Sequence, residues 1–151
     1  MTEIKRQSPV SFKVRPVKME DRNDWPVVLE YENENTGQYL VDLSYVCRWD
    51  VQDADLDKIK PAKVAIPSKP GESVLSGGVL INRMNNIQAS VWQFSQETPD
   101  HPGELAYTDV SESTVALAII GSKAYSIAEK LSSLDLSDNN KQAPFLLQGP
   151  F

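Results

Sequence analysis

Residue types that commonly carry catalysis are scarce in this sequence. There is one histidine, His101, and one cysteine, Cys47, and they stand far apart along the chain. No C-x-x-C or H-x-x-x-H spacing occurs, so no zinc site is predicted. The G-x-S-x-G spacing of a serine nucleophile and the glycine-rich loops that bind phosphates are also missing. We therefore expect no catalytic residue and no metal ligand in this chain.

The one dense group of potential oxygen ligands is an acidic run formed by Asp50, Asp53, Asp55 and Asp57. Carboxylate oxygens are the ligands that calcium prefers, and the EF-hand loop is the usual way of arranging them. The run lacks the glycine and the final glutamate of that loop. We interpret it as a solvated acidic edge.

The elements that must position any site are clearest in residues 106–136. Residues 114–120 form an apolar, partly β-branched run that is typical of a buried strand. Gly121 would end this strand in a sharp turn, and Ser122 would cap the helix that follows. An apolar stripe at helical spacing predicts that helix, and its members are Ala124, Ile127, Ala128, Leu131 and Leu134.

The rest of the chain reads as strands and turns. We expect an edge strand at 11–18, a charged turn at 19–24, a strand over Trp25–Tyr31 and an extended proline-rich segment at 61–73. A hairpin is predicted at 77–94, with Asn85 and Asn86 in its turn, because asparagine tolerates the left-handed conformation. The pattern predicts an α+β fold whose sheet is mixed or antiparallel, with a few helices packed on one side.

Composition limits the class of protein. The chain has 151 residues, 40% apolar and 24% charged, which fits one globular domain over 1–151, with the polar loop 95–104 as the best internal boundary. A net charge of −6 and a pI near 4.8 argue against a general nucleic-acid or anionic-membrane partner. No apolar stretch approaches the length of a membrane span, and the first residues lack the apolar core of a secretory signal. We expect a cytoplasmic protein.

A short sequence echo links two parts of the chain. The tripeptide D-L-S at 42–44 returns as D-V-S at 109–111, and each copy precedes an apolar stretch. The echo is short enough to arise by chance. If it is real, it predicts two related starts within one fold.

The second copy also carries a family resemblance. The D-V-S turn, the strand, Gly121 with Ala124, and the L-D-L at 134–136 resemble the opening unit of the glycine-cleavage T-protein superfamily. That superfamily includes folate-binding aminomethyltransferases and the small gamma subunit of heterotetrameric sarcosine oxidase. Its pattern is roughly D-[LV]-S, a strand, G-P-x-A and a helix ending in D-L. Ser122 and Lys123 depart from it at the proline.

The resemblance implies a T-protein-like fold and a place in one-carbon metabolism. No residue here matches the family's catalytic aspartate or pterin-holding glutamate. The resemblance therefore implies a small accessory subunit of a folate-linked demethylase or amine oxidase complex, bound to a larger subunit. It implies no cofactor on this chain alone, and tetrahydrofolate within the complex. Whether the isolated chain is an enzyme stays open, although a non-catalytic chain is favoured.

Two other functions remain open. One is a free-standing binder of folate-like small molecules, with Trp25, Trp49 or Trp92 lining its pocket. In a folate context, Arg48 and Arg83 could pair with the ligand's carboxylates, whereas isolated arginines usually form surface ion pairs. The other is a structural interaction module with no one-carbon link.

The C-terminal tail carries the candidate interface. An apolar cluster at the end of the chain docks either on its own domain or on another chain. Its members are Phe145, Leu146, Leu147 and Phe151.

Overall fold

The computed structural model describes residues 6–22, 24–34, 37–95, 104–131 and 136. Within them the strands, in chain order, are β1 (Pro16–Arg22), β2 (Trp25–Tyr31), β3 (Tyr39–Asp42), β4 (Cys47–Gln52), β5 (Ser73–Ser76), β6 (Val79–Arg83), β7 (Gln88–Gln93), β8 (Tyr107–Asp109) and β9 (Leu117–Ile120). Two 3-10 turns, η1 (Leu56–Lys58) and η2 (Pro61–Lys63), lie between β4 and β5. The α-helix α1 (Ala124–Ala128) follows β9.

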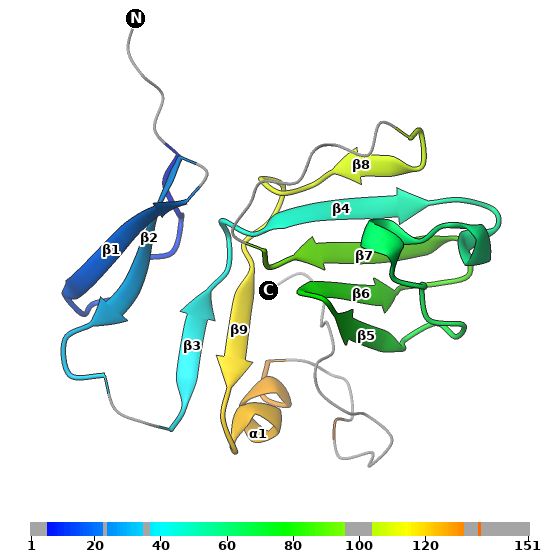
Figure 1. Ribbon diagram of the computed structural model, residues 1–151. Coiled ribbons are helices and arrows are strands. Elements are labelled where there is room, and N and C mark those ends of the chain that lie inside the picture. Colours follow the sequence, from blue (N-terminus) through cyan, green and yellow to red (C-terminus); the bar gives the residue numbers. More distant parts are fainter. Residues whose placement is uncertain (1–5, 23, 35–36, 96–103, 132–135, 137–151) are drawn as a thin grey trace, which may run out of the picture.

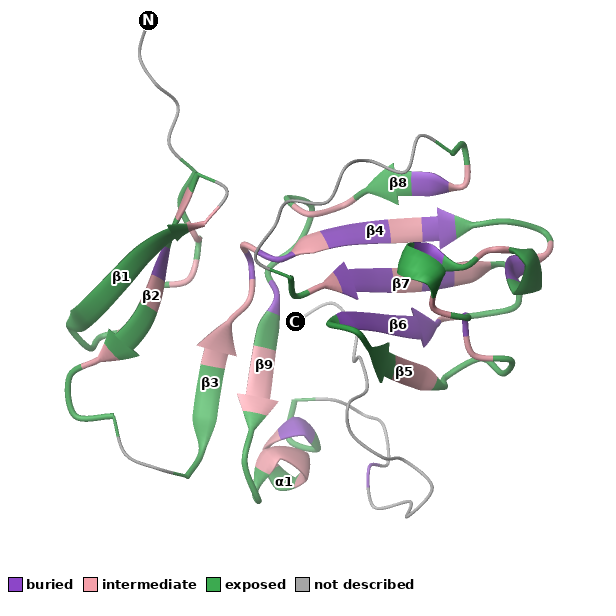
Figure 2. Ribbon diagram, in the orientation of Figure 1, coloured by how far each residue is buried: buried purple, intermediate pink, exposed green. Residues whose placement is uncertain are grey.

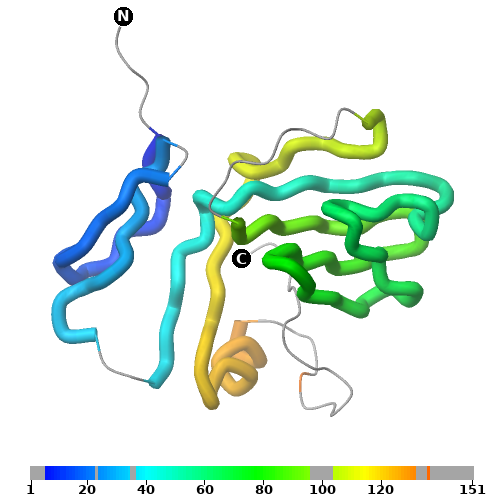
Figure 3. The backbone as a smooth tube through the Cα atoms, in the orientation of Figure 1, coloured from blue at the N-terminus to red at the C-terminus, as the bar shows by residue number. Residues whose placement is uncertain are grey.

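These strands form three antiparallel sheets (Figure 1). The largest has the order β5-β6-β7-β4-β8, and the other two are the pairs β1-β2 and β3-β9. The backbone trace shows that the chain turns from β3 into β4 beside the place where it turns from β8 into β9 (Figure 3). The five-stranded sheet and the β3-β9 pair therefore meet where these two turns lie side by side.

The core is built on the five-stranded sheet. Strand side chains alternate between faces, so Trp49, Val51, Ile81 and Val91 fall on one face. The 3-10 turns cover this face and bury Leu56 against it. Figure 2 shows the contrast between β6, which is buried throughout, and β1, which is exposed almost throughout.

The opposite face of the same sheet holds a smaller apolar cluster. Its buried members are Val46, Leu80, Trp92 and Ala116. Ala116 lies just before β9 in the sequence, so this cluster joins the large sheet to the β3-β9 pair. Both faces of the central strands are thus covered, and β6 is buried along its whole length rather than at alternate positions.

The fold is richer in strands than the α+β class expected from the sequence. The prediction of an antiparallel sheet is confirmed, but the helical part is small. α1 has five residues, buries only Ala128 and has Leu131 exposed beyond its end. Most helices in proteins are stabilised by packing of an apolar face, and within the described residues α1 buries one side chain of that face. Leu134, the last member of the expected stripe, lies outside the described residues.

Strand limits differ from expectation at the first hairpin. The β2 prediction is confirmed, but β1 runs through the segment 19–22, which was expected to be part of a charged turn. Antiparallel pairing with β2 decides the conformation there, from Pro16 opposite Tyr31 to Arg22 opposite Trp25. Charged residues are compatible with this strand because its side chains are exposed.

Two turn predictions are wrong in their chemistry. Ser122 does not cap α1: the N-cap residue is Lys123, and its backbone N–H donates to Gln38 Oε1 at 2.9 Å. In the β6-β7 hairpin, which is confirmed, Asn85 and Asn86 are not left-handed. Instead, Asn85 Oδ1 accepts the N–H of Ile87 at 2.9 Å, so the asparagine side chain holds the turn.

Residues 61–73 are only partly the extended segment that was expected. The segment begins with η2, in which Ala62 and Lys63 take left-handed angles. Ile66 then packs into the core under the five-stranded sheet.

Candidate functional site

The two D-x-S tripeptides form the same turn. In the first, Asp42 Oδ1 accepts the backbone N–H of Ser44 at 2.9 Å; in the second, Asp109 Oδ1 accepts that of Ser111 at 2.8 Å. An aspartate that bonds the N–H two residues ahead makes an Asx-turn. The sequence echo is therefore matched by a repeated local structure.

The two turns also bond to each other in a reciprocal way. Leu43 N–H donates to Ala116 O at 2.8 Å, and Ala116 N–H donates to Ser44 Oγ at 3.4 Å. In the other direction, Val110 N–H donates to Arg48 O at 3.0 Å, and Arg48 N–H donates to Ser111 Oγ at 2.9 Å.

We call residues 42–48 and 109–116 the crossing. Strand β3 leads into β4 through the first turn, and β8 leads into β9 through the second, while β3 pairs with β9 and β4 with β8. The hydrogen bonds of the crossing thus relate its two halves by an approximate two-fold symmetry.

Arg48 lies at the centre of the crossing and is 2% exposed. Its guanidinium donates to Thr114 Oγ1 at 2.9 Å, to Thr114 O at 2.8 Å and to Ser111 O. Burial lowers its pKa, with the nearby carboxylates of Asp109 and Asp42 acting in the opposite direction. Its Nε has no hydrogen-bond partner among the described residues. The Arg48 side chain thus holds the second Asx-turn in place through the carbonyl groups of Ser111 and Thr114.

Trp92 is the cross-strand neighbour of Arg48 and shares its face of the sheet. The guanidinium carbon of Arg48 lies 5.4 Å from the ring centroid, within range of a cation–π contact. The indole N–H of Trp92 donates to Ser90 Oγ at 2.9 Å. The structure thus brings together Arg48 and Trp92, both of which were predicted to bind a ligand, and both have protein partners.

Arg83, which was also predicted to bind a ligand, lies elsewhere on the five-stranded sheet. It is 8% exposed and donates to Pro67 O, Asn85 O and Asn86 O, with Asp57 Oδ1 at 3.0 Å. It ties the β6-β7 turn to the loop after η2. The surface ion pair considered from the sequence exists, but three carbonyl groups share the guanidinium with it.

Three carboxylates of the acidic run have partners within the protein. Asp55 pairs with Lys58 at 2.7 Å, and this bond lowers the pKa of Asp55. Asp57 pairs with Arg83, and Asp50 accepts from Gln88 Nε2 at 2.9 Å. Among the described residues no group of three or more potential ligands is placed to hold a metal ion.

A shallow groove of about 400 Å³ lies along the outer side of the crossing. Its lining includes Trp25 from β2, Ser44 and Ser111 from the two Asx-turns, and Glu112. Arg6 also lines it and pairs with Glu112 at 2.7 Å. The groove has the volume of a small-molecule site, with an aromatic ring, hydroxyl groups and one ion pair on its walls.

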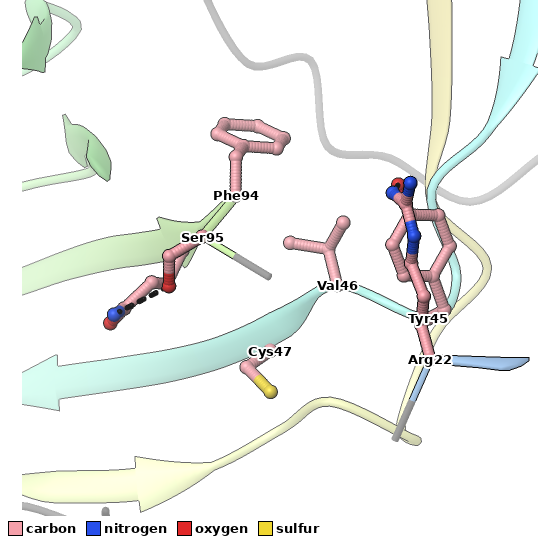
Figure 4. A pocket seen from close by; sticks show the side chains of 7 residues that line it. Arg22, Tyr45, Val46, Cys47, Phe94 and Ser95 are labelled. Atoms are coloured by element: carbon pink, nitrogen blue, oxygen red, sulfur yellow. Dashed lines mark hydrogen bonds between the residues drawn. The ribbon is translucent and has the colours of Figure 1, made fainter. Parts of the chain in front are cut away.

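A second hollow lies near Cys47 (Figure 4), with Arg22, Tyr45 and Phe94 among its lining residues. Its volume of about 10 Å³ is at the limit for one water molecule. Arg22 lies over the Tyr45 ring at 5.7 Å and donates to its hydroxyl at 3.3 Å. Burial raises the pKa of the Cys47 thiol, which disfavours the reactive thiolate.

The sequence did not predict that Ser111 and Thr114 accept the hydrogen bonds of the Arg48 guanidinium. The usable signal was the D-x-S echo, which marks the turn that the arginine holds. The predicted interface residues Phe145, Leu146, Leu147 and Phe151 lie outside the described residues, as does His101.

No helix in the described ranges has the length and apolarity needed to cross a bilayer. Comparison of the chain with family models, with curated proteins and with solved structures finds no match.

Proposed function

We propose that this protein is a non-catalytic protein-binding module that acts as an accessory subunit of a larger complex. The observation that carries the proposal is the exposure of apolar side chains on the β1-β2 hairpin. Val17 is 60% exposed and Met19 is 53% exposed, and Val14 just before β1 is 46% exposed. These three apolar side chains lie close together in the sequence, and exposed apolar surface can form a protein-binding site.

The β1-β2 hairpin forms a separate two-stranded sheet. Within the described part of the chain, β1 and β2 pair only with each other, and a lone two-stranded hairpin is marginally stable in water. Its anchors to the rest of the protein include the buried Val27 and the contact of Arg22 with Tyr45. A partner that covered Val17 and Met19 would remove apolar area from water and stabilise the hairpin.

The identity of the partner rests on the sequence resemblance alone. A gamma-like role implies a larger folate- or flavin-dependent subunit, with tetrahydrofolate bound in the complex rather than by this chain. The repeated Asx-turn supports the reading of D-V-S as a turn, which is one local part of the family pattern.

The test is co-purification of the tagged full-length protein at native expression level, with masses and stoichiometry of the bound chains. We expect a larger chain at fixed stoichiometry, lost in Met19→Lys and retained in Lys18→Ala, a neighbouring exposed change that keeps the apolar side chains. Circular dichroism of both variants controls for folding. Recovery of the protein alone would refute the accessory-subunit role.

A second candidate function is supported by the groove at the crossing. Trp25, one of the tryptophans predicted to line a pocket, lies in its wall. Titration with tetrahydrofolate should quench tryptophan fluorescence if this is a folate-like binding site. The quenching should be lost in Trp25→Phe and kept in Trp49→Phe, because Trp49 is buried in the core of the five-stranded sheet. No change in fluorescence would exclude this candidate.

A further inference from the structure

The segment that contains β9 has neither a charge nor a proline to oppose pairing at the outer edge of this strand. The ten residues from Ser113 to Ser122 hold no charged side chain and no proline. By contrast, the β1-β2 hairpin carries Pro16, Lys18 and Pro26 and two shifts of register. Charges, prolines and bulges are the usual means by which proteins prevent edge-to-edge pairing.

The register of β3 and β9 shows which backbone groups face the outer edge. Leu43 N–H bonds to Ala116 O, and antiparallel pairs alternate between bonded and non-bonded positions. Ala118 therefore bonds to β3, whereas the N–H and C=O groups of Leu117 and Ile119 point away from it. Among the described residues only β3 pairs with β9, so these four groups have no ladder partner.

We propose that two copies of this protein pair through β9, antiparallel, about a two-fold axis at Ala118. In this register Leu117 lies opposite the partner subunit's Ile119, and the reverse holds by symmetry. These are the residues whose N–H and C=O groups point outward, so the two pairs form four backbone hydrogen bonds. The two β3-β9 sheets then join into one four-stranded sheet.

The side chains of β9 are compatible with this register. The close, non-bonded position on the axis is occupied by Ala118, the smallest side chain in the strand. Leu117 is 45% exposed and would gain an aliphatic cross-strand neighbour. The register is self-complementary, because Leu117 of each copy faces Ile119 of the other and neither strand brings a charge to the contact. A second copy of the chain is therefore the partner that fits this edge.

The test is the mass of the purified full chain by sedimentation equilibrium from micromolar to millimolar concentration. We expect the wild type to approach twice the 16.8 kDa of one chain as concentration rises. Ile119→Pro removes one outward N–H per copy and no bond to β3, so it should be monomeric over the same range. Ile119→Ala shortens the same side chain but keeps the N–H, and it should still dimerise.

A second variant covers the case in which Ile119→Pro does not fold. Leu117→Lys places the new ammonium group opposite Asp42 on β3, which favours the folded monomer. The same change puts a charge at the proposed contact, so dimerisation should weaken by at least tenfold. A wild type that stays monomeric at every concentration, or folded Ile119→Pro and Leu117→Lys variants that both still dimerise, would overturn the proposal.

Discussion

Ser44 and Ser111 exchange roles across the crossing. The hydroxyl of Ser44 accepts the N–H of Ala116, which follows the second Asx-turn, and the hydroxyl of Ser111 accepts the N–H of Arg48, which follows the first. Each serine therefore satisfies a backbone donor that belongs to the other turn. The five-stranded sheet and the β3-β9 pair meet at this exchange, so its hydrogen bonds connect parts of the chain that are distant in sequence.

The first prediction concerns these hydroxyl groups. Ser111→Ala should lower the free energy of unfolding by about 1–2 kcal/mol, because it removes a 2.9 Å bond and leaves the N–H of Arg48 without its acceptor. Ser44→Ala should cost less, since the bond it removes is longer, at 3.4 Å. Urea unfolding followed by tryptophan fluorescence measures both.

The exposed Ser68 provides the control, and Ser68→Ala should stay within about 0.5 kcal/mol of the wild type. The double variant Ser44→Ala/Ser111→Ala should depart from additivity, because the two residues act in one hydrogen-bonded network. Strict additivity would argue against a reciprocal arrangement.

The second prediction concerns the buried guanidinium. Arg48→Met should lower the free energy of unfolding by about 2–4 kcal/mol, since the carbonyl groups of Ser111 and Thr114 lose their donor. Arg48→Lys should not restore it, because an ammonium group cannot reproduce the planar fork of donors. Arg15→Ala is the matched control, with its side chain 81% exposed and an expected change below about 0.5 kcal/mol. Equal stability of the Lys variant and the wild type would contradict the role given to the guanidinium.

The third prediction concerns Gly121, which has a φ of +126°. A Cβ at this position would lie 2.5 Å from Gln38 Oε1 and 2.6 Å from Gly37 O. Gly121→Ala should therefore destabilise the protein by about 2 kcal/mol, through backbone strain and displacement of Gln38 from the start of α1. Gly77→Asn, in the β5-β6 turn at φ +57° with nothing within 4 Å, should be nearly neutral in thermal unfolding.

The fourth prediction is a pH dependence. Burial raises the pKa of the Cys47 thiol in the folded protein above its value in the unfolded chain. The folded state then binds the proton more tightly, so stability is fully present below the thiol pKa of the unfolded chain and falls as pH rises above it. Cys47→Ala should reduce this alkaline loss, measured as urea midpoints from pH 7 to 10. Tyr107, whose pKa burial also raises, should leave a residual slope at the alkaline end.

The sequence predicted best where local chemistry decides the structure. The strand Trp25–Tyr31 and the β6-β7 hairpin follow from apolar runs bounded by turn formers. The echo at 42–44 and 109–111 marked both Asx-turns, because a turn held by its own aspartate depends on adjacent residues only.

Predictions failed where distant partners decide. The extent of β1 is set by pairing with β2, which overrides its charged residues. The strand was expected to start at residue 114, but β9 starts at Leu117. Thr114 instead accepts a hydrogen bond from Arg48, which lies 66 positions earlier in the chain. The residues around 114 do not by themselves predict the hydrogen bonds between Arg48 and Thr114. Similarly, the start of α1 bonds Gln38 rather than a cap of its own, and this partner is 85 residues away.

The crossing has a consequence for the order in which the chain folds. Strands β5, β6 and β7 are neighbours in sequence and can form two local hairpins with little loss of chain entropy. The crossing instead joins residues 63 and 72 positions apart, and it requires both Asx-turns to be present together. Contacts of such long range are made late and slowly. Newly made chains therefore have to expose both edges of β9 until its long-range pairing with β3 forms.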